Sequence, residues 1–146
     1  MSSTEHIEGW EKLVAALGDW PTFHDAEVIS VSAERSIPVE VGCASARVVV
    51  HIRRYETRGE GTAQYEQVLS RNVLATFQFS GVADLELSEF NHQNVINSLV
   101  VHRDTSQDEE RAPYVVTIES ICGLGGTLRG ARVELAAVEV LPSAVA

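Results

Sequence analysis

The sequence is poor in cysteine, in aromatic residues and in basic residues, and it contains no long apolar run. Its two cysteines, Cys43 and Cys122, lie outside any CxxC pair. Two cysteines are too few for the disulfide framework of a secreted domain, and neither has a histidine or acidic residue at the spacing of a zinc finger. We therefore expect two free, mostly buried thiols in a reducing cytoplasm, in a chain that folds without disulfides or a structural metal.

Membrane segments and export signals are also missing from the sequence. No apolar stretch approaches the roughly 20 residues that a membrane-spanning helix needs. The first residues, Met-Ser-Ser-Thr-Glu-His, lack both the basic start and the apolar centre of a signal peptide. The sequence therefore predicts a cytoplasmic protein.

Basic residues are outnumbered by acidic ones, 11 to 21, which gives a formal net charge of −10. An acidic surface is repelled by nucleic acid and by anionic membranes, so neither is expected as a partner. A basic protein such as a nuclease is a compatible partner. The simpler alternative is that the acidity only keeps the protein soluble.

The length of 146 residues favours one domain spanning 1–146. The N-terminal segment predicts one amphipathic helix over about 5–17, because its apolar residues recur at helical spacing. Gly18 and Pro21 are expected to end it. The residues of the apolar stripe are Ile7, Trp10, Leu13, Val14 and Leu17.

From about residue 26 to 141 the apolar period changes to two, which indicates about seven strands. The pattern places Ile29, Val31 and Ala33 on one buried face, and it does the same for alternate residues over 47–53 and 71–80. The polar stretch 54–67 is interpreted as a long hairpin loop. The predicted fold class is α+β, with the N-terminal helix packed on a mostly antiparallel, curved sheet.

Acidic side chains gather on one predicted strand, at 82–89. Asp84 and Glu86 are two residues apart, so both project from one face about 7 Å from each other. Glu89 follows at the strand's end. Acidic residues of predicted loops extend this set; they are Glu56, Glu60, Glu66, Asp104, Asp108, Glu109 and Glu110. The alternative is an ordinary solvated sheet face.

The adjacent His24 and Asp25 invite comparison with metal-dependent phosphohydrolases. That chemistry requires further ligands at helical spacing, which the predicted turn at His92 and the outward-facing strand position of His51 do not provide. We favour a structural role in which Asp25 accepts backbone N–H bonds and His24 fills a polar niche. No catalytic residue, metal or cofactor is expected.

Two motifs and a hairpin together carry a family resemblance. They are Trp20–Glu27 (WPTFHDAE), Phe90–Ile96 (FNHQNVI) and the Glu119-Ser120…Gly123-Leu124-Gly125-Gly126 hairpin. Over roughly 20–135 the chain resembles the bacterial immunity protein 50 family. The resemblance implies a cytoplasmic antidote to a polymorphic toxin, with an α+β fold. The matching positions are Trp20, Phe23, His24, Asp25, Glu27, Phe90, Asn91, Gln93, Asn94 and Ile96, which we interpret as mainly structural residues that satisfy backbone groups at sheet corners.

Three functional hypotheses follow. The favoured one is a non-enzymatic protein that occludes a cognate toxin, with its binding residues at Asp84, Glu86, Glu89 and 108–110, and its specificity in 54–67 and 104–111. The second is a small metal-dependent hydrolase that uses His24, Asp25 and His92. The third is a self-associating domain without a toxin partner, and homodimer formation is left open by the sequence.

Overall fold

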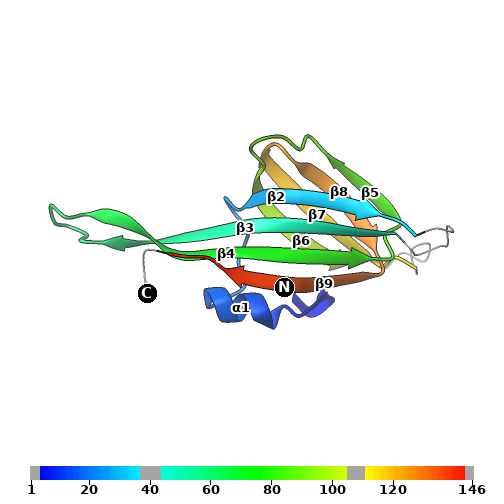
Figure 1. The fold of residues 1–146 in the computed structure, drawn as a ribbon, viewed down its shortest axis with the longest axis horizontal. Coiled ribbons are helices and arrows are strands. Elements are labelled where there is room, and N and C mark those ends of the chain that lie inside the picture. Colours follow the sequence, from blue (N-terminus) through cyan, green and yellow to red (C-terminus); the bar gives the residue numbers. More distant parts are fainter. Residues whose placement is uncertain (1–3, 37–43, 105–110, 144–146) are drawn as a thin grey trace.

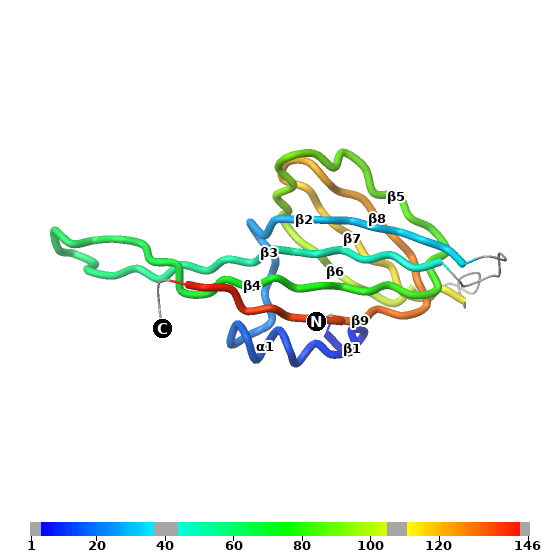
Figure 2. The backbone as a smooth tube through the Cα atoms, viewed as in Figure 1, coloured from blue at the N-terminus to red at the C-terminus, as the bar shows by residue number. Residues whose placement is uncertain are grey.

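The computed structural model describes residues 4–36, 44–104 and 111–143, and these form nine strands in one mixed sheet with one short α-helix (Figures 1 and 2). The strands are β1 (Ile7–Glu8), β2 (Glu27–Glu34), β3 (Ser45–Arg58), β4 (Glu66–Ser80), β5 (Asp84–Ser88), β6 (Val95–Arg103), β7 (Tyr114–Cys122), β8 (Gly125–Gly130) and β9 (Arg132–Val140). The helix α1 spans Glu11–Leu17, after a 3₁₀ turn η1 at Thr4–His6.

The predicted α+β fold of a helix packed on about seven strands is wrong, since 61% of the molecule is strand and 8% is helical. The part of the predicted helix before Glu11 is not α-helical. Gly9, at φ +80°, breaks the segment, and Ile7 joins the sheet as the parallel partner of Val133. A strand of two residues has no period of its own, so the apolar stripe could not show that Ile7 belongs to the sheet.

The sheet order is β1-β9-β4-β3-β2-β6-β7-β8-β5. All pairs are antiparallel except β1 with β9. The sheet bends over on itself, so that β9, β4, β3 and β2 form one layer and β6, β7, β8 and β5 cross behind it at a steep angle (Figure 1). The bend lies where β2 meets β6, because those strands pair only at Glu27 and Val95.

The hydrophobic core fills the space between the two layers. Phe77 and Phe79 stack in its centre with ring centroids 6.3 Å apart, and Phe23 meets Phe77 edge-on at 5.9 Å. Helix α1 contributes Leu13 and Leu17, both buried, and packs against β9 and β4. It ends at Gly18 in the left-handed conformation, as predicted. No helix among the described residues is long and apolar enough to cross a bilayer.

Alternation along β3 and β4 agrees with the sequence, since residues 48, 50, 52, 73, 75, 77 and 79 are all buried. The prediction for β2 is wrong at Ile29. A bulge lies between Val28 and Ser30, so Val28 is 1% exposed while Ile29 is 47% exposed. One inserted residue reverses the faces of a strand, and no residue at this position signals a bulge in advance. Val31 and Ala33 do share the inner side, opposite the buried Val48 and Ala46, and Val31 packs against the core.

The stretch 54–67 is not a long loop. β3 continues to Arg58 and β4 begins at Glu66, so only 59–65 form the turn. Pairing of β3 with β2 stops at His51, and pairing of β4 with β9 stops at Val73. Residues 53–71, called the arm below, therefore form a two-stranded ribbon that projects beyond the rest of the sheet (Figures 1 and 2).

Candidate interaction surface

The outer face of the layer β6-β7-β8-β5 carries the acidic strand residues. Residues opposite each other across a ladder point to the same side, and their neighbours in sequence point to the other side. Leu99, Val116, Ile118 and Leu128 of these strands are buried on the inner side. The outer side therefore presents the residues between them, in cross-strand rows such as Val100-Thr117-Thr127-Glu86.

Asp84 and Glu86 both project from this outer face, on β5 at the edge of the sheet, and both are exposed. Asp84 lies opposite Arg129 of β8. The guanidinium of Arg129 donates to Asp104 Oδ2 at 2.8 Å and to the carbonyl oxygen of Ala112 at 3.3 Å. The inner side of β5 is only partly covered, because Leu85 remains 37% exposed.

Glu89 is not part of β5, which ends at Ser88. Its backbone has φ +70°, a left-handed conformation that is costly for a residue with a side chain. Its carbonyl oxygen accepts a hydrogen bond from the Asn91 side chain at 3.0 Å, which holds the turn after β5. The predicted binding residues Asp108, Glu109 and Glu110 lie outside the described residues.

His24 and Asp25 flank the same outer face, at the start of β2. The His24 ring Nδ1 lies 2.9 Å from Asn97 Oδ1, and Asn97 Nδ2 donates to Glu119 Oε1 at 2.7 Å. The second ring nitrogen of His24 lies 3.6 Å from Asp25 Oδ1. The side chains of His24 and Asp25 are 58% and 72% exposed. These four residues thus form a polar network on the surface, which runs from the turn before β2 across β6 to β7.

Asp25 does not cap backbone groups through its carboxylate. Its own backbone N–H donates to the carbonyl oxygen of Ile96 at 2.9 Å, while Ala26 N–H donates to Phe23 at 3.0 Å. Phe23 and Asp25 adopt φ of +67° and +66°. This strained turn drives the Phe23 ring into the core, 2% exposed, with the half-buried Trp20 ring edge-on against it at 5.6 Å.

No metal site is assembled from the described parts of the chain: within 4–36, 44–104 and 111–143, no three His, Cys, Asp or Glu side chains are grouped to hold an ion. His92 is exposed in the turn before β6. His24, Asp25 and His92 are therefore not brought together as the ligand set of the hydrolase hypothesis.

Asn94 is a buried polar residue, 3% exposed, between the start of β2, the start of β6 and the turn that joins β7 to β8. Its side-chain oxygen accepts from the backbone N–H groups of Asn91 at 2.9 Å and Leu124 at 3.1 Å. Its side-chain nitrogen donates to the carbonyl oxygens of Asn91 at 2.8 Å and Val28 at 3.3 Å. All four hydrogen-bonding positions of the amide are thus occupied by backbone groups.

Neighbouring motif residues support the same corner. Asn91 Oδ1 accepts from the Gln93 backbone N–H at 2.9 Å, which closes an Asx-type turn. Gly123 packs against this turn so closely that a Cβ atom placed on it would lie 2.3 Å from the carbonyl oxygen of Gln93. The two motifs of the sequence and the 123–126 hairpin therefore meet in space, around Asn94.

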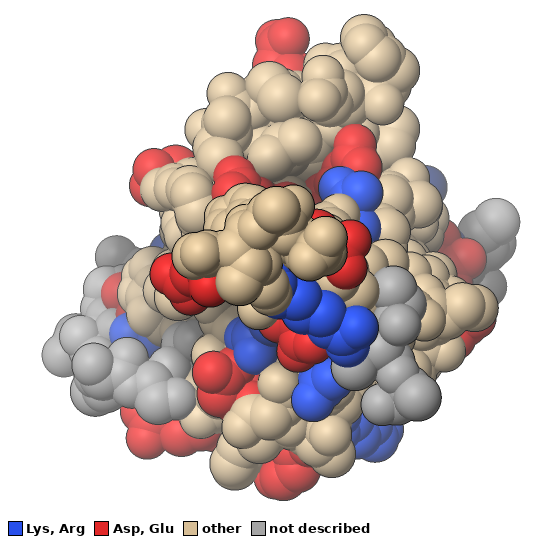
Figure 3. Space-filling model, turned by 90° about the vertical axis from the view of Figure 1, so that its left-hand side faces the viewer, with Lys and Arg blue, Asp and Glu red and all other residues tan. Residues whose placement is uncertain are grey.

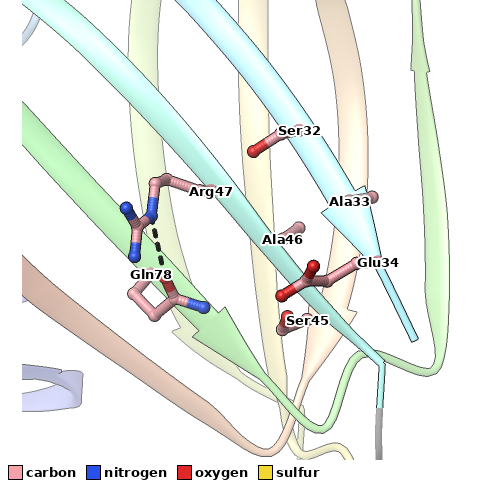
Figure 4. Close-up of a pocket in the computed structure, with 7 residues that line it drawn as sticks. All are labelled: Ser32, Ala33, Glu34, Ser45, Ala46, Arg47 and Gln78. Carbon is pink, nitrogen blue, oxygen red and sulfur yellow. Dashed lines mark hydrogen bonds between the residues drawn. The ribbon is translucent and has the colours of Figure 1, made fainter. Parts of the chain in front are cut away.

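A polar hollow lies over the C-terminal ends of β2 and β4 and the N-terminal end of β3 (Figure 4). In it Arg47 Nε donates to Gln78 Oε1 at 3.0 Å, and the Glu34 carboxylate points from β2 over β3 toward Ser45. The other lining residues are Ser32, Ala33 and Ala46. The described lining residues bring together no nucleophile with a histidine, so these residues do not form a catalytic arrangement of the triad kind. Of the two cysteines, Cys122 is exposed at the end of β7, contrary to the expectation of a mostly buried thiol, and Cys43 lies outside the described residues.

The arm is the feature that sequence reasoning missed. Tyr55 and Tyr65 on it are 53% and 57% exposed. Figure 3 looks along the arm, with acidic residues around its near end and basic residues gathered below it. One short signal was present in the sequence, since Tyr55-Glu56-Thr57-Arg58 alternates uncharged with charged residues just before a turn that contains Gly59 and Gly61.

Comparisons with known proteins give one positive result. No curated protein and no solved structure matches the chain. The family described as Immunity protein 50 matches it over residues 9–141, which includes α1, both motifs, the arm and eight of the nine strands, β2 to β9. Because this match covers far more than half of the sequence, the chain belongs to the immunity protein 50 family.

Proposed function

We propose that the protein binds a cognate bacterial toxin and neutralises it by covering the toxin's active site or substrate channel. The observation that carries this proposal is the family match over residues 9–141. Proteins of an immunity family act on a toxin by binding it, so the mechanism needs an exposed, specific surface and no reacting group. We accordingly assign a binding role and no catalytic step to His24 and Asp25.

The partner that suits this chain is a basic toxin, such as a nuclease. With a net charge of −10, the protein attracts a cationic protein over a distance comparable to the Debye length. Asp84 and Glu86 on β5, together with Asp25 and Glu119 at the other end of the same outer face, direct this attraction to one side of the molecule. Such steering raises association rates by one to three orders of magnitude at low salt.

We place the protein in the cytoplasm, as one component of a polymorphic toxin system. The toxin gene of such a pair lies beside the immunity gene, which gives a direct choice of partner for an experiment. An antidote of this kind acts on toxin that reaches, or is made in, the same compartment.

Co-expression with the product of the neighbouring gene tests the proposal. We expect cells that carry the toxin to grow when this chain is present, and the two purified proteins to elute together at a 1:1 ratio. The control is the toxin co-expressed with an unrelated acidic protein of similar size. Growth inhibition that this chain does not relieve, together with separate elution of the two proteins, would refute the proposal.

A further inference from the structure

Among the described residues, none forms a strand beside the arm on either edge. Beyond His51 no described strand pairs with the free edge of β3. Beyond Asn72, whose carbonyl oxygen accepts a hydrogen bond from Leu141 N–H at 2.7 Å, none pairs with the free edge of β4. A two-stranded ribbon in water is marginally stable by itself, and free edges invite pairing with other chains. An exposed ribbon of this length is therefore a costly feature unless it serves an interaction.

The two faces of the arm differ in chemistry. Cross-strand pairing places Tyr55 opposite Leu69 and Thr57 opposite Gln67, so one face carries these four residues and no charge over its outer part. Arg53 follows on the same side at the base of the arm, since it lies two residues before Tyr55. The opposite face carries Glu56, Arg58, Glu66 and Val68. Arg58 Nε donates to Glu56 Oε1 at 3.1 Å, as expected for residues two apart on the same side of a strand.

The arm is held in place at its base. Arg54 donates to the carbonyl oxygen of Leu17 at 3.1 Å and to Asp19 Oδ1 at 2.5 Å, which joins the ribbon to the C-terminal end of α1. The Ser70 hydroxyl donates to the carbonyl oxygen of Arg54 at 3.1 Å across the bulge there.

The turn at the tip is also closed by internal hydrogen bonds. The Thr62 hydroxyl donates to the carbonyl oxygen of Gly59 at 2.6 Å and accepts from Gln64 N–H at 3.2 Å. The arm is thus ordered before any partner binds, which lowers the entropy cost of binding.

From this geometry we propose that the arm enters the concave, positively charged substrate cleft of the toxin, and that Tyr55 on its uncharged face and Tyr65 in its turn pack against the walls of that cleft. This inference rests on the proposed function above. Exposed tyrosines on a rigid support are frequent anchors of protein interfaces, because they bury a large area at low conformational cost. The outer part of the arm, 56–66, has three glutamates and one arginine, which suits a cationic cleft that normally holds a polyanion. The other arginines of the arm lie at its base, where Arg54 is paired with Asp19; they are Arg53, Arg54 and Arg71.

A second copy of this chain suits the arm less well. The uncharged face is two strands wide, at about 4.8 Å per strand, and about five residues long, at about 3.3 Å per residue, so its area is roughly 150–200 Å². A stable dimer buries about 800 Å² on each partner. Two copies, each with a net charge of −10, also repel one another. A cleft, in contrast, covers both faces and the tip of a projecting ribbon at once.

The test compares two double variants that each remove exposed apolar surface. In the arm variant, Tyr55→Thr is combined with Tyr65→Thr, and threonine keeps the strand preference of the replaced residue. In the matched control, Ile29→Thr is combined with Val140→Thr, which are 47% and 70% exposed and lie outside both the arm and the outer face of the back layer. Binding kinetics are measured by surface plasmon resonance against the neighbouring-gene toxin, inactivated by mutation, and folding is checked by thermal melting.

We expect the arm variant to dissociate at least about 30-fold faster than the wild type, and the control to change by less than about 3-fold. A second arm variant, with 56–68 replaced by Asn-Gly to join the pair Tyr55 and Leu69 directly, should lose binding altogether.

If both arm variants bind the toxin as the wild type does, the inference is wrong and the proposed function stands. Absence of binding and of neutralisation by the wild type would instead overturn the proposed function, and this inference with it. Sedimentation of the protein alone gives a separate check: a wild-type dimer that becomes a monomer in the arm variant would show that the occupant of the arm is a second copy.

Discussion

The side-chain oxygen of Asn94 accepts a hydrogen bond from the backbone N–H of Leu124 at 3.1 Å, and this bond ties the turn before β6 to the turn between β7 and β8. Asn94 occupies the meeting point of segments that are distant in sequence, and water cannot replace it because the residue is 3% exposed. The corner of the back layer therefore depends on one amide group.

Replacement of this amide should lower stability substantially. Asn94→Ala removes the partner of four backbone groups, and the hydrogen bonds to two of them, at Val28 and Leu124, are buried. We expect the free energy of unfolding to fall by about 2–4 kcal/mol. Asn97→Ala is the control, because the hydrogen bonds of Asn97 are exposed, and it should cost less than about 1 kcal/mol. Urea unfolding followed by circular dichroism measures both. Equal losses in the two variants would contradict the role given to Asn94.

Two glycines with the same backbone angle separate conformational strain from steric overlap. Gly61 and Gly123 both have φ +79°. A Cβ atom at Gly61 meets nothing within 4 Å, whereas at Gly123 it would lie 2.6 Å from Asn94 Oδ1. Gly61→Ala should therefore cost about 1 kcal/mol of unfolding free energy, from strain alone. Gly123→Ala should cost at least about 2 kcal/mol more, since the corner must shift. Chemical denaturation of both proteins measures the difference, and equal costs would contradict the close packing of that corner.

Charge reversal on β5 tests the steering part of the proposed function. Asp84→Lys with Glu86→Lys should slow association with the toxin about tenfold or more at low salt, with little change in the dissociation rate. The matched control, Glu34→Lys with Glu139→Lys, makes the same change in net charge at exposed residues of β2 and β9. Stopped-flow association at several salt concentrations measures the effect. Equal slowing in both variants would show that net charge matters and the β5 face does not.

The ion pair between Glu8 of β1 and Arg132 of β9 gives a pH dependence. Two hydrogen bonds from the Arg132 guanidinium to the Glu8 carboxylate hold the pKa of Glu8 below its ordinary value. A group with a lowered pKa in the folded state stabilises the fold above its unfolded pKa, and this contribution disappears as the pH falls through the folded value. We expect the wild type to melt slightly above Glu8→Gln at pH 7, and the two melting curves to converge at acid pH. Glu139→Gln serves as the control, and a difference that persists unchanged in acid would contradict this assignment.

The stability of the arm is expected to be separate from that of the core. Replacement of 56–68 by Asn-Gly removes residues that are mostly exposed, and it retains the contacts of Arg54 with α1. The free energy of unfolding should change by less than about 1 kcal/mol. Thermal and urea unfolding measure the change, and a truncated protein that fails to fold would show that the arm supports the core.

Much of the sheet was predictable from local pattern, and its arrangement was not. Val48, Val50 and the phenylalanines of β4 alternate so regularly that their burial follows from the period of a strand. The bulge at Ile29 and the break at Gly9 depend on contacts with β3 and β9, which no local pattern reports. The change from a predicted helix to the parallel strand β1 is a case of tertiary pairing overriding local preference.

For the acidic residues, too, the local arrangement could be predicted from the sequence and the long-range arrangement could not. That Asp84 and Glu86 share an exposed face was predictable from their spacing of two. The network from Asp25 through His24 and Asn97 to Glu119 was not, because it requires β2, β6 and β7 to be placed side by side by the bend in the sheet. The arm was hidden in a polar stretch, since a ribbon with two exposed faces lacks the buried apolar stripe by which strands are usually recognised.

The position of β9 between β4 and β1 has a consequence for the order of events during synthesis. Strand β1 and helix α1, which are translated first, both pack against residues 132–140, which are translated after all the other strands described. The front layer cannot close until that segment has left the ribosome, because contacts between distant parts of the sequence form only when both are present. A nascent chain that stops before β9 would therefore carry the arm and the outer acidic face but lack a finished core, so protection against a toxin would begin only once this strand is made.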